Sequence, residues 1–64
     1  MERKEYPNGV SIELDVNNDT RQLVARVYDD KILKKTFESK DAHDAAGTYA
    51  KVLVRVKGHR DLRR

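Results

Sequence analysis

The chain has 64 residues and a formal net charge of +3, with 39% charged and 38% hydrophobic residues, which suits one small domain with a heavily solvated surface. It contains no cysteine, so a disulfide framework and a thiolate zinc site are both excluded. No apolar run is long enough to cross a membrane, and the first residues do not resemble a secretory leader. We therefore expect a cytoplasmic protein without a membrane partner, in which residues 1–64 form a single domain.

The positive charge is concentrated at the C-terminal end. Residues 51–64 carry six Lys or Arg residues against Asp61, a balance of +5, so residues 1–50 carry −2. We expect an ordered core of about residues 8–58 followed by a basic tail, residues 59–64. A basic end favours an acidic partner such as nucleic acid. The alternative is that cations gather at a helix C-terminus because the helix dipole favours them there.

The first predicted element is a strand over residues 10–16, in which apolar and polar residues alternate. Apolar side chains at residues 10, 12, 14 and 16 share one face, and Ser11, Glu13 and Asp15 share the other. The turn-forming stretch of residues 6–9 precedes this strand. We therefore expect the first five residues to be frayed.

Residues 22–28 and 31–37 predict a β-hairpin around Asp29 and Asp30. A loop one residue longer than this Asp pair sets Val27 opposite Leu33 and Leu23 opposite Phe37. A slip of one residue would exchange the inward and outward faces of the hairpin, so the apolar pattern indicates which register forms. The inward face then gathers Leu23, Ala25, Val27, Leu33 and Phe37, with Lys35 at its edge.

The last element is a predicted helix that begins after Ser39, a good N-cap, and stops at Gly58. Its apolar stripe follows helical spacing. The alternating valines of residues 52–56 favour a strand instead, but no turn residue separates them from the preceding helical pattern. The stripe consists of Ala42, Ala46, Tyr49, Leu53 and Val56, and is widened by Ala45 and Ala50.

Together these elements predict an α+β fold, a three-stranded antiparallel β-meander with one C-terminal helix packed on one face (β-β-β-α). The small residues of the helix allow its backbone to approach the sheet closely. Gly47 within the helix costs about 1 kcal/mol relative to alanine, and we expect close packing against the sheet to compensate for it.

Candidate catalytic and metal-ligating residues are sparse. The serines are Ser11 on a strand and Ser39 at the cap, while His43 and His59 lie sixteen residues apart without a matching carboxylate cluster. No glycine-rich phosphate loop is present. We therefore expect no enzymatic activity, no catalytic residues, no metal, no cofactor and no small-molecule substrate.

The predicted sheet face away from the helix carries the candidate binding residues. Arg26 and Lys34 can contact phosphates, and Tyr28 offers a stacking surface. Two alternatives remain: Glu13 and Asp15 pair with these cations on an ordinary solvated face, or the face binds a protein or a second copy, as a homodimer, through its apolar residues. The apolar residues concerned are Val24, Tyr28 and Ile32.

Residues 21–46 resemble the later part of double-stranded-RNA-binding domains, in which a hairpin leads into a serine–lysine pair and an alanine-rich helix. Ser39, Lys40 and the alanines that follow carry this likeness. Residues 35–46 also resemble the strand-to-helix junction of the arm-binding domain of tyrosine recombinases, a small β-β-β-α domain whose sheet enters the DNA major groove. This second resemblance implies DNA contacts by Arg26, Tyr28, Lys34 and Thr36.

The sequence therefore predicts a small non-enzymatic nucleic-acid-binding module, with DNA favoured over RNA. It would use the open sheet face and the basic tail. The alternative is an inhibitor or accessory factor of a virus, phage or mobile element that binds a host protein through the sheet face or a strand edge. The cations expected to bind nucleic acid, beside Tyr28 and Thr36, are Arg26, Lys34, Lys57, Arg60, Arg63 and Arg64.

Overall fold

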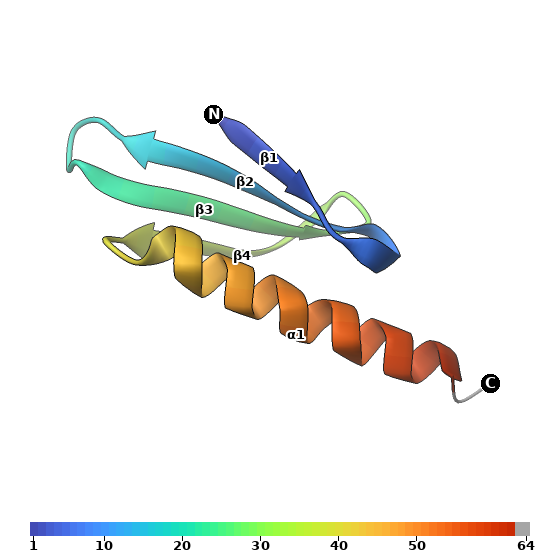
Figure 1. Cartoon of the computed structure of the whole chain (residues 1–64). Helices are drawn as coiled ribbons and strands as arrows, with labels where there is room; N and C mark the ends of the chain where they lie inside the picture. The colour runs from blue at the N-terminus through green and yellow to red at the C-terminus, as the bar shows by residue number, and fades with distance from the viewer. Residues whose placement is uncertain (63–64) are drawn as a thin grey trace.

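The computed structural model describes the backbone of residues 1–62 and the side chains of residues 1–58. A single antiparallel sheet in the order β1-β2-β3-β4 is covered on one face by one long helix, α1 (Figure 1). The α+β class and the C-terminal helix are confirmed, but the sheet has four strands and not the three that we expected. The elements are β1 (Glu2–Glu5), the 3-10 turn η1 (Pro7–Gly9), β2 (Val10–Asn17), β3 (Gln22–Asp29), β4 (Ile32–Ser39) and α1 (Ala42–Leu62).

The additional strand is β1, which occupies the segment that we expected to be frayed. It pairs antiparallel with β2, with Glu2 opposite Leu14 and Glu5 opposite Ser11. The strand is missed by sequence patterning because its four residues are all charged and all exposed, so no apolar alternation marks it. The ordered part of the chain thus begins near residue 2 and not residue 8.

The chain reverses between β1 and β2 through η1. Asn8 and Gly9 both adopt positive φ angles, of 66° and 81°, and the Tyr6 amide donates to the Val10 carbonyl at 2.8 Å. This tight reversal sets β1 beside β2. Residues 6–9 therefore form the turn that their composition predicts.

The pairing of β2 with β3 confirms the predicted alternation. Ile12 lies opposite Val27 and Leu14 opposite Ala25, and all four side chains are buried beneath α1. The intervening residues point to the open face. The open-face pairs are Ser11 with Tyr28, Glu13 with Arg26, and Asp15 with Val24.

The register predicted for the hairpin of β3 and β4 is wrong. Asp30 and Lys31 form a two-residue turn with φ angles of 51° and 71°, the left-handed geometry that suits a tight hairpin. A bulge on β4 then adds one residue, so Val27 lies opposite Lys35. As a result Phe37 still packs against the core, whereas Leu33 lies opposite Tyr28 and is 50% exposed.

Both predicted ends of the helix need correction. Asp41 stands at the N-cap position, because its carbonyl accepts from the Ala45 amide, while the Ser39 hydroxyl accepts from the Asp41 amide at 3.2 Å. The helix continues through Gly58 to Leu62, so residues 59–62 belong to α1. Residues 63 and 64 lie outside the described part of the chain.

The face of α1 against the sheet is built from alanines. Ala42, Ala46 and Ala50 recur every four residues and are fully buried, which lets the helix approach the larger side chains of β2 and β3. Val56, which we placed in this stripe, is 46% exposed. A Cβ on Gly47 would lie 3.8 Å from the Tyr6 hydroxyl, an ordinary contact, so close packing against the sheet does not explain this glycine.

Within the described residues, no helix is both long enough and apolar enough to cross a membrane.

Candidate functional site

The open face of the sheet contains a shallow hollow of about 260 Å³ near the β3–β4 turn. Two cations, one carboxylate and one phenol line it. Arg3 lies on β1, Glu13 is its cross-strand neighbour on β2, Tyr28 lies on β3, and Lys31 lies in the turn that follows β3. Residues from four successive segments thus meet at one place because each strand pairs with the next.

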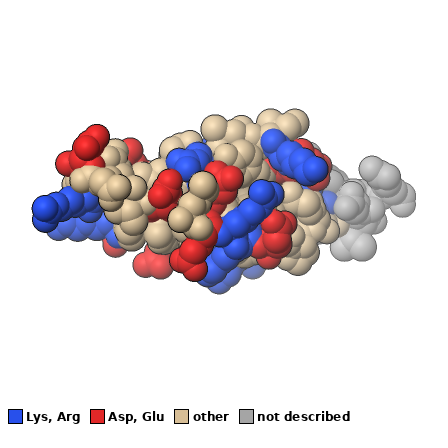
Figure 2. Space-filling model, turned by 90° about the horizontal axis from the view of Figure 1, so that it is seen from above, with Lys and Arg blue, Asp and Glu red and all other residues tan. Residues whose placement is uncertain are grey.

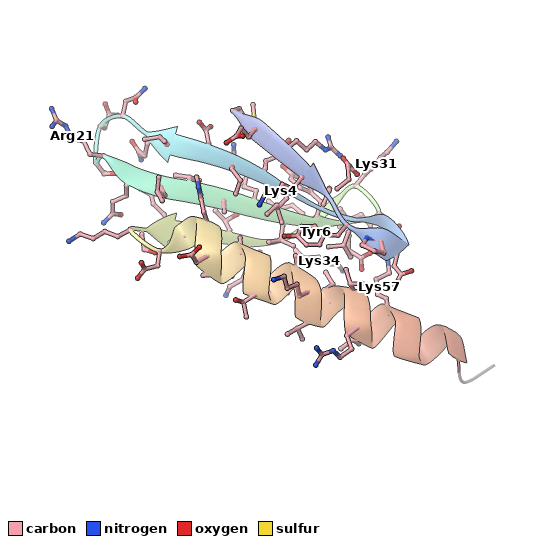
Figure 3. The ribbon with its side chains drawn as sticks, viewed as in Figure 1. Lys4, Tyr6, Arg21, Lys31, Lys34 and Lys57 are labelled. Atoms are coloured by element: carbon pink, nitrogen blue, oxygen red, sulfur yellow. The ribbon has the colours of Figure 1, made fainter. Side chains whose placement is uncertain are left out.

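The turn places Lys31 at one end of the sheet. Its positive φ angle is part of the two-residue reversal, and its side chain projects from that turn, whereas Arg21 projects from the loop at the opposite end of the sheet (Figure 3). Lys31 from the turn and Arg3 from the edge strand β1 therefore line the same hollow as Tyr28.

Hydrogen bonds to Glu13 hold the floor of the hollow. Its Oε1 accepts from the Tyr28 hydroxyl at 3.0 Å and from Arg26 Nε at 3.2 Å. These two bonds, with Tyr28 the larger cause, lower the pKa of Glu13. The carboxylate is therefore ionised at neutral pH, and the Tyr28 ring is fixed by its own hydroxyl.

Arg26 is committed to two carboxylates. In addition to Glu13, its guanidinium contacts Asp15 Oδ2 at 3.4 Å, and the side chain is only 29% exposed. The bond to Glu13 is the main reason that the pKa of Arg26 is raised. The cross-strand pairing that we considered as an alternative is thus present, and Arg26 is not a free cation.

The other residues expected to bind nucleic acid are scattered. Lys34 and Thr36 are exposed on β4. Lys57 is turned toward the interior of the molecule, where it donates to Asp29, Asp30 and the Asn8 carbonyl and is 15% exposed. The side chain of Arg60 lies outside the described residues, as do Arg63 and Arg64.

The residues expected to form an apolar interface do not form one continuous patch. Val24 is 8% exposed, between Asp15 on β2 and Glu38 on β4. Ile32, which we expected on the open face, lies opposite Asp29, the partner of Lys57 on α1, so it is on the helix side of the sheet, where it is 62% exposed. Tyr28 belongs to the hollow. Among the described residues, the open face is therefore polar at its centre, and Leu33, opposite Tyr28, is an exposed apolar side chain on its β4 side.

On the face of the molecule that Figure 2 shows, positive and negative side chains are mixed. Lys and Arg side chains alternate there with Asp and Glu, and neither sign forms a continuous patch (Figure 2). Among residues 1–58, the cations outside ion pairs are Lys4, Arg21, Lys31, Lys34, Lys35, Lys40, Lys51 and Arg55. Any attraction for an anionic partner must therefore come from local groups of cations.

No protein-family model, curated protein or solved structure matches the chain. In the described residues, no group of three or more His, Asp or Glu side chains is arranged to hold a metal ion.

Chemically, the hollow offers an aromatic ring beside two positively charged side chains; within the described residues Lys31 is outside ion pairs, whereas Arg3 Nε donates to Glu5 Oε2 at 2.8 Å. Such a ring stacks on a nucleobase, and the cations contact the adjoining phosphates. Sequence patterning found Tyr28 and Glu13 because both lie on predicted strands. It missed Arg3, because the charged first strand has no apolar pattern, and Lys31, because only the turn geometry brings it to the open face.

Proposed function

We propose that this protein is a non-enzymatic, cytoplasmic nucleic-acid-binding module that holds a single strand of DNA across the open face of its sheet. The hollow between Arg3, Tyr28 and Lys31 is the observation that carries the proposal. One base stacks on the Tyr28 ring, and Lys31 contacts an adjoining phosphate. Arg3 contacts a second phosphate in exchange for its exposed ion pair with Glu5. The hydrogen bond from the Tyr28 hydroxyl to Glu13 fixes the ring before the base arrives.

A single strand suits this face better than a duplex. Glu13 and Asp15 lie on β2, at the middle of the sheet, and would face the phosphates of a double helix laid across all four strands. A single strand can place its bases on the sheet and its backbone near the cations at the turn and the β1 edge. Unpaired bases are also the ones free to stack on an aromatic side chain.

The remaining positive charge strengthens nucleic-acid binding without selecting a base sequence. Lys34 is exposed on β4, and Arg60, Arg63 and Arg64 add charge at the C-terminal end. Contacts between such cations and phosphates release counterions, so affinity falls as salt rises. We expect a measurable complex at low salt that weakens steadily as salt increases.

Fluorescence anisotropy with a labelled DNA oligonucleotide tests the proposal. Replacing Tyr28 by alanine removes the stacking surface and should cost about 1–3 kcal/mol, roughly tenfold or more in affinity. Tyr28→Phe keeps the ring and should retain most of the affinity. RNA and duplex DNA of the same sequence serve as parallel probes, and the expected order places the single DNA strand first.

Two lysines supply a matched control. Lys31 lines the hollow, whereas Lys51 is exposed on α1, on the other side of the sheet. Lys31→Gln should reduce the slope of log affinity against log salt by about 0.7, the value for one phosphate contact to a single strand. Lys51→Gln makes the same change in net charge and should leave the slope unaltered. Equal effects of the two substitutions, or no binding at low salt, would refute the proposal.

A protein partner is the second candidate, favoured by the exposure of Ile32 and Leu33 at the start of β4. In this case the protein would be an inhibitor or accessory factor, and nucleic acid would not bind at low salt. Ile32→Asp would then abolish capture of the host partner, whereas Tyr28→Ala would not change it.

A further inference from the structure

The outer strand β4 leaves one long edge of the sheet unpaired (Figure 1). Within the described residues no strand lies beyond it, and six of its eight residues are exposed. A bulge interrupts its pairing with β3 beside Val27 and Tyr28, but residues 35–39 pair regularly. Alternate residues of this regular run therefore direct their backbone donors and acceptors away from the sheet. The run has the length of an ordinary short strand, so this edge can accept one further strand.

The free edge carries an excess of positive charge. Residues 32–40 hold three cations and one carboxylate, a balance of +2. Within the described residues none of the three cations belongs to an ion pair. The other edge strand, β1, has two cations and two carboxylates in its four residues, a balance of zero. The two edges therefore differ in charge as well as in length. The three cations are Lys34, Lys35 and Lys40.

The carboxylate of β4 is turned away from the free edge. Glu38 Oε2 accepts from the Asn17 side chain at 3.0 Å and from the Thr20 hydroxyl at 3.2 Å. Asn17 lies on β2, and β3 separates β2 from β4, so the Glu38 side chain reaches inward across β3. Lys35, in contrast, is exposed, with its ammonium 5.9 Å from the Phe37 ring centroid. Along residues 32–40, an arriving strand thus meets lysines without a competing carboxylate.

Exposed apolar side chains lie on the helix side of this edge. Ile32 on β4 is 62% exposed, and Val52 and Val56 on α1 are 52% and 46% exposed. The two valines follow Tyr49 by three and seven residues, so they lie on the same flank of the helix. Tyr49 packs against Phe37 of β4, with ring centroids 5.8 Å apart. This flank is therefore on the β4 side, and a strand added to β4 would lie beside it.

The charge of the edge excludes a second copy and favours an acidic partner. Two β4 edges would bring the lysines of both copies together, and like charges that face each other across strands destabilise the pairing. Lysines on an edge strand prevent self-association in this way, whereas an acidic chain is attracted by the same lysines. A peptide that adds a strand to a sheet gains main-chain hydrogen bonds, and its side chains provide selectivity. The edge therefore fits an extended segment that combines acidic and apolar residues.

We propose that β4 binds an extended acidic segment of a partner protein, which pairs with residues 35–39 as a fifth strand of the sheet. Its acidic residues contact the three lysines of the edge, and its apolar residues contact Val52 and Val56. The hollow on the open face is not part of this contact, so the proposal does not rest on nucleic-acid binding. Tyr28→Ala, which removes the stacking ring of the hollow, should leave binding of the acidic segment unchanged.

Titration with a designed peptide tests strand addition. A peptide that repeats Glu-Glu-Val-Val three times places both residue types on each face of a strand. At low salt it should slow hydrogen exchange of amides in residues 35–39, while the amides of β1 exchange as before. A peptide of Lys-Lys-Val-Val repeats should not protect them. The acidic peptide with N-methylated valines keeps its charge but lacks main-chain donors, and should bind about tenfold more weakly. Equal affinity of the two acidic peptides would overturn strand addition.

Matched lysine substitutions locate the contact. Lys34→Glu reverses one charge on β4 and should raise the dissociation constant of the acidic peptide about tenfold. Lys51→Glu makes the same change in net charge on the exposed side of α1 and should leave this constant unchanged. No binding of the acidic peptide at millimolar concentration, or equal weakening by the two substitutions, would overturn the proposal. Protection of residues 35–39 by single-stranded DNA but not by the acidic peptide would assign the edge to nucleic acid and also overturn it.

Discussion

Gly9 shows how a single residue can control the β1–β2 reversal. It has a φ angle of 81°, in the region that favours glycine. A Cβ at this position would overlap Asp30 Oδ1 in the neighbouring hairpin turn. The Gly9 carbonyl also accepts from the Asp30 amide at 3.0 Å. The two turns are thus held together where a side chain has no room.

Replacing Gly9 by alanine should therefore lower the free energy of unfolding by about 1–3 kcal/mol, the usual range for backbone strain at one residue. Urea unfolding followed by circular dichroism measures this change. Gly47→Ala is the control, because α1 accepts a Cβ there and alanine should raise stability by about 1 kcal/mol. A Gly9→Ala protein as stable as wild type would show that the two turns do not meet as described.

The ionised side chains of Glu13 and Asp15 should make stability depend on acid pH. Hydrogen bonds from Tyr28 and Arg26 lower the pKa of Glu13 from 4.5, and the Val16 amide is the first cause that lowers the pKa of Asp15 from 3.8. A lowered folded-state pKa means that the unfolded chain binds protons first as pH falls. This stabilisation is present above about pH 4.5 and is lost progressively below it.

Urea unfolding at pH 6 and at pH 3 should show this loss in the wild type. Glu13→Gln removes one titrating group while keeping a polar side chain, and should make the difference between the two pH values smaller. Were the variant to lose as much stability on acidification as the wild type, Glu13 would not contribute to the acid limb.

At the scale of elements, Lys57 connects three segments that are distant in the sequence. From α1 it donates to the η1 carbonyl of Asn8 and to the carboxylates of Asp29 and Asp30 at the end of β3 and in the hairpin turn. Nearby, the Asn8 side chain donates to the Val54 carbonyl at 3.1 Å. The helix is therefore fastened to the turn end of the sheet by polar contacts, beyond the alanine stripe.

Lys57→Met should lower the melting temperature, because it leaves the largely buried Asp29 carboxylate without its cation. Lys51→Met, on the exposed side of α1, should have little effect. Hydrogen bonding to Asp29, followed by Asp30, raises the pKa of Lys57 above 10.5. Its contribution is thus full below that pH and lost as pH rises through the folded value. Equal melting temperatures of the two variants would contradict a stabilising contact between Lys57 and Asp29.

What the sequence predicted at this scale depended on hydrophobic period. Alternation in residues 10–16 located β2 and its two faces, and the alanine spacing located the buried side of α1. The strand β1 has no such period, since it forms only by pairing with β2. The helix continues past Gly58 because tertiary contacts of Lys57 and Asn8 hold its last turns. Local helix propensity does not reveal such contacts.

The candidate site, like the fold, could be predicted from the sequence only where a hydrophobic period marks the strand. Tyr28 and Glu13 lie on strands with clear alternation, so their place on the open face followed from the sequence. Arg26 was placed on the correct face, but its pairing with Glu13 and Asp15 depends on the register of β2 and β3. Arg3 and Lys31 needed the fourth strand and the left-handed turn, and neither was visible in the pattern.

At the scale of the whole molecule, the two faces of the sheet differ: one is covered by the helix and the other is open. α1 covers one side of the sheet, and four of the nine buried apolar residues in the described part of the chain are alanines. A core this small gives a 64-residue domain limited stability. The open side keeps the hollow, where we propose that nucleic acid binds.

Amide chemical-shift mapping by NMR is the most direct test of this claim. A labelled sample is titrated at low salt with a short single strand of DNA. We expect the largest shifts at Arg3, Glu13, Tyr28 and Lys31, and negligible shifts at Thr48 and Lys51 on the exposed side of α1. Shifts confined to α1, or no shifts at all at low salt, would contradict binding at the open face.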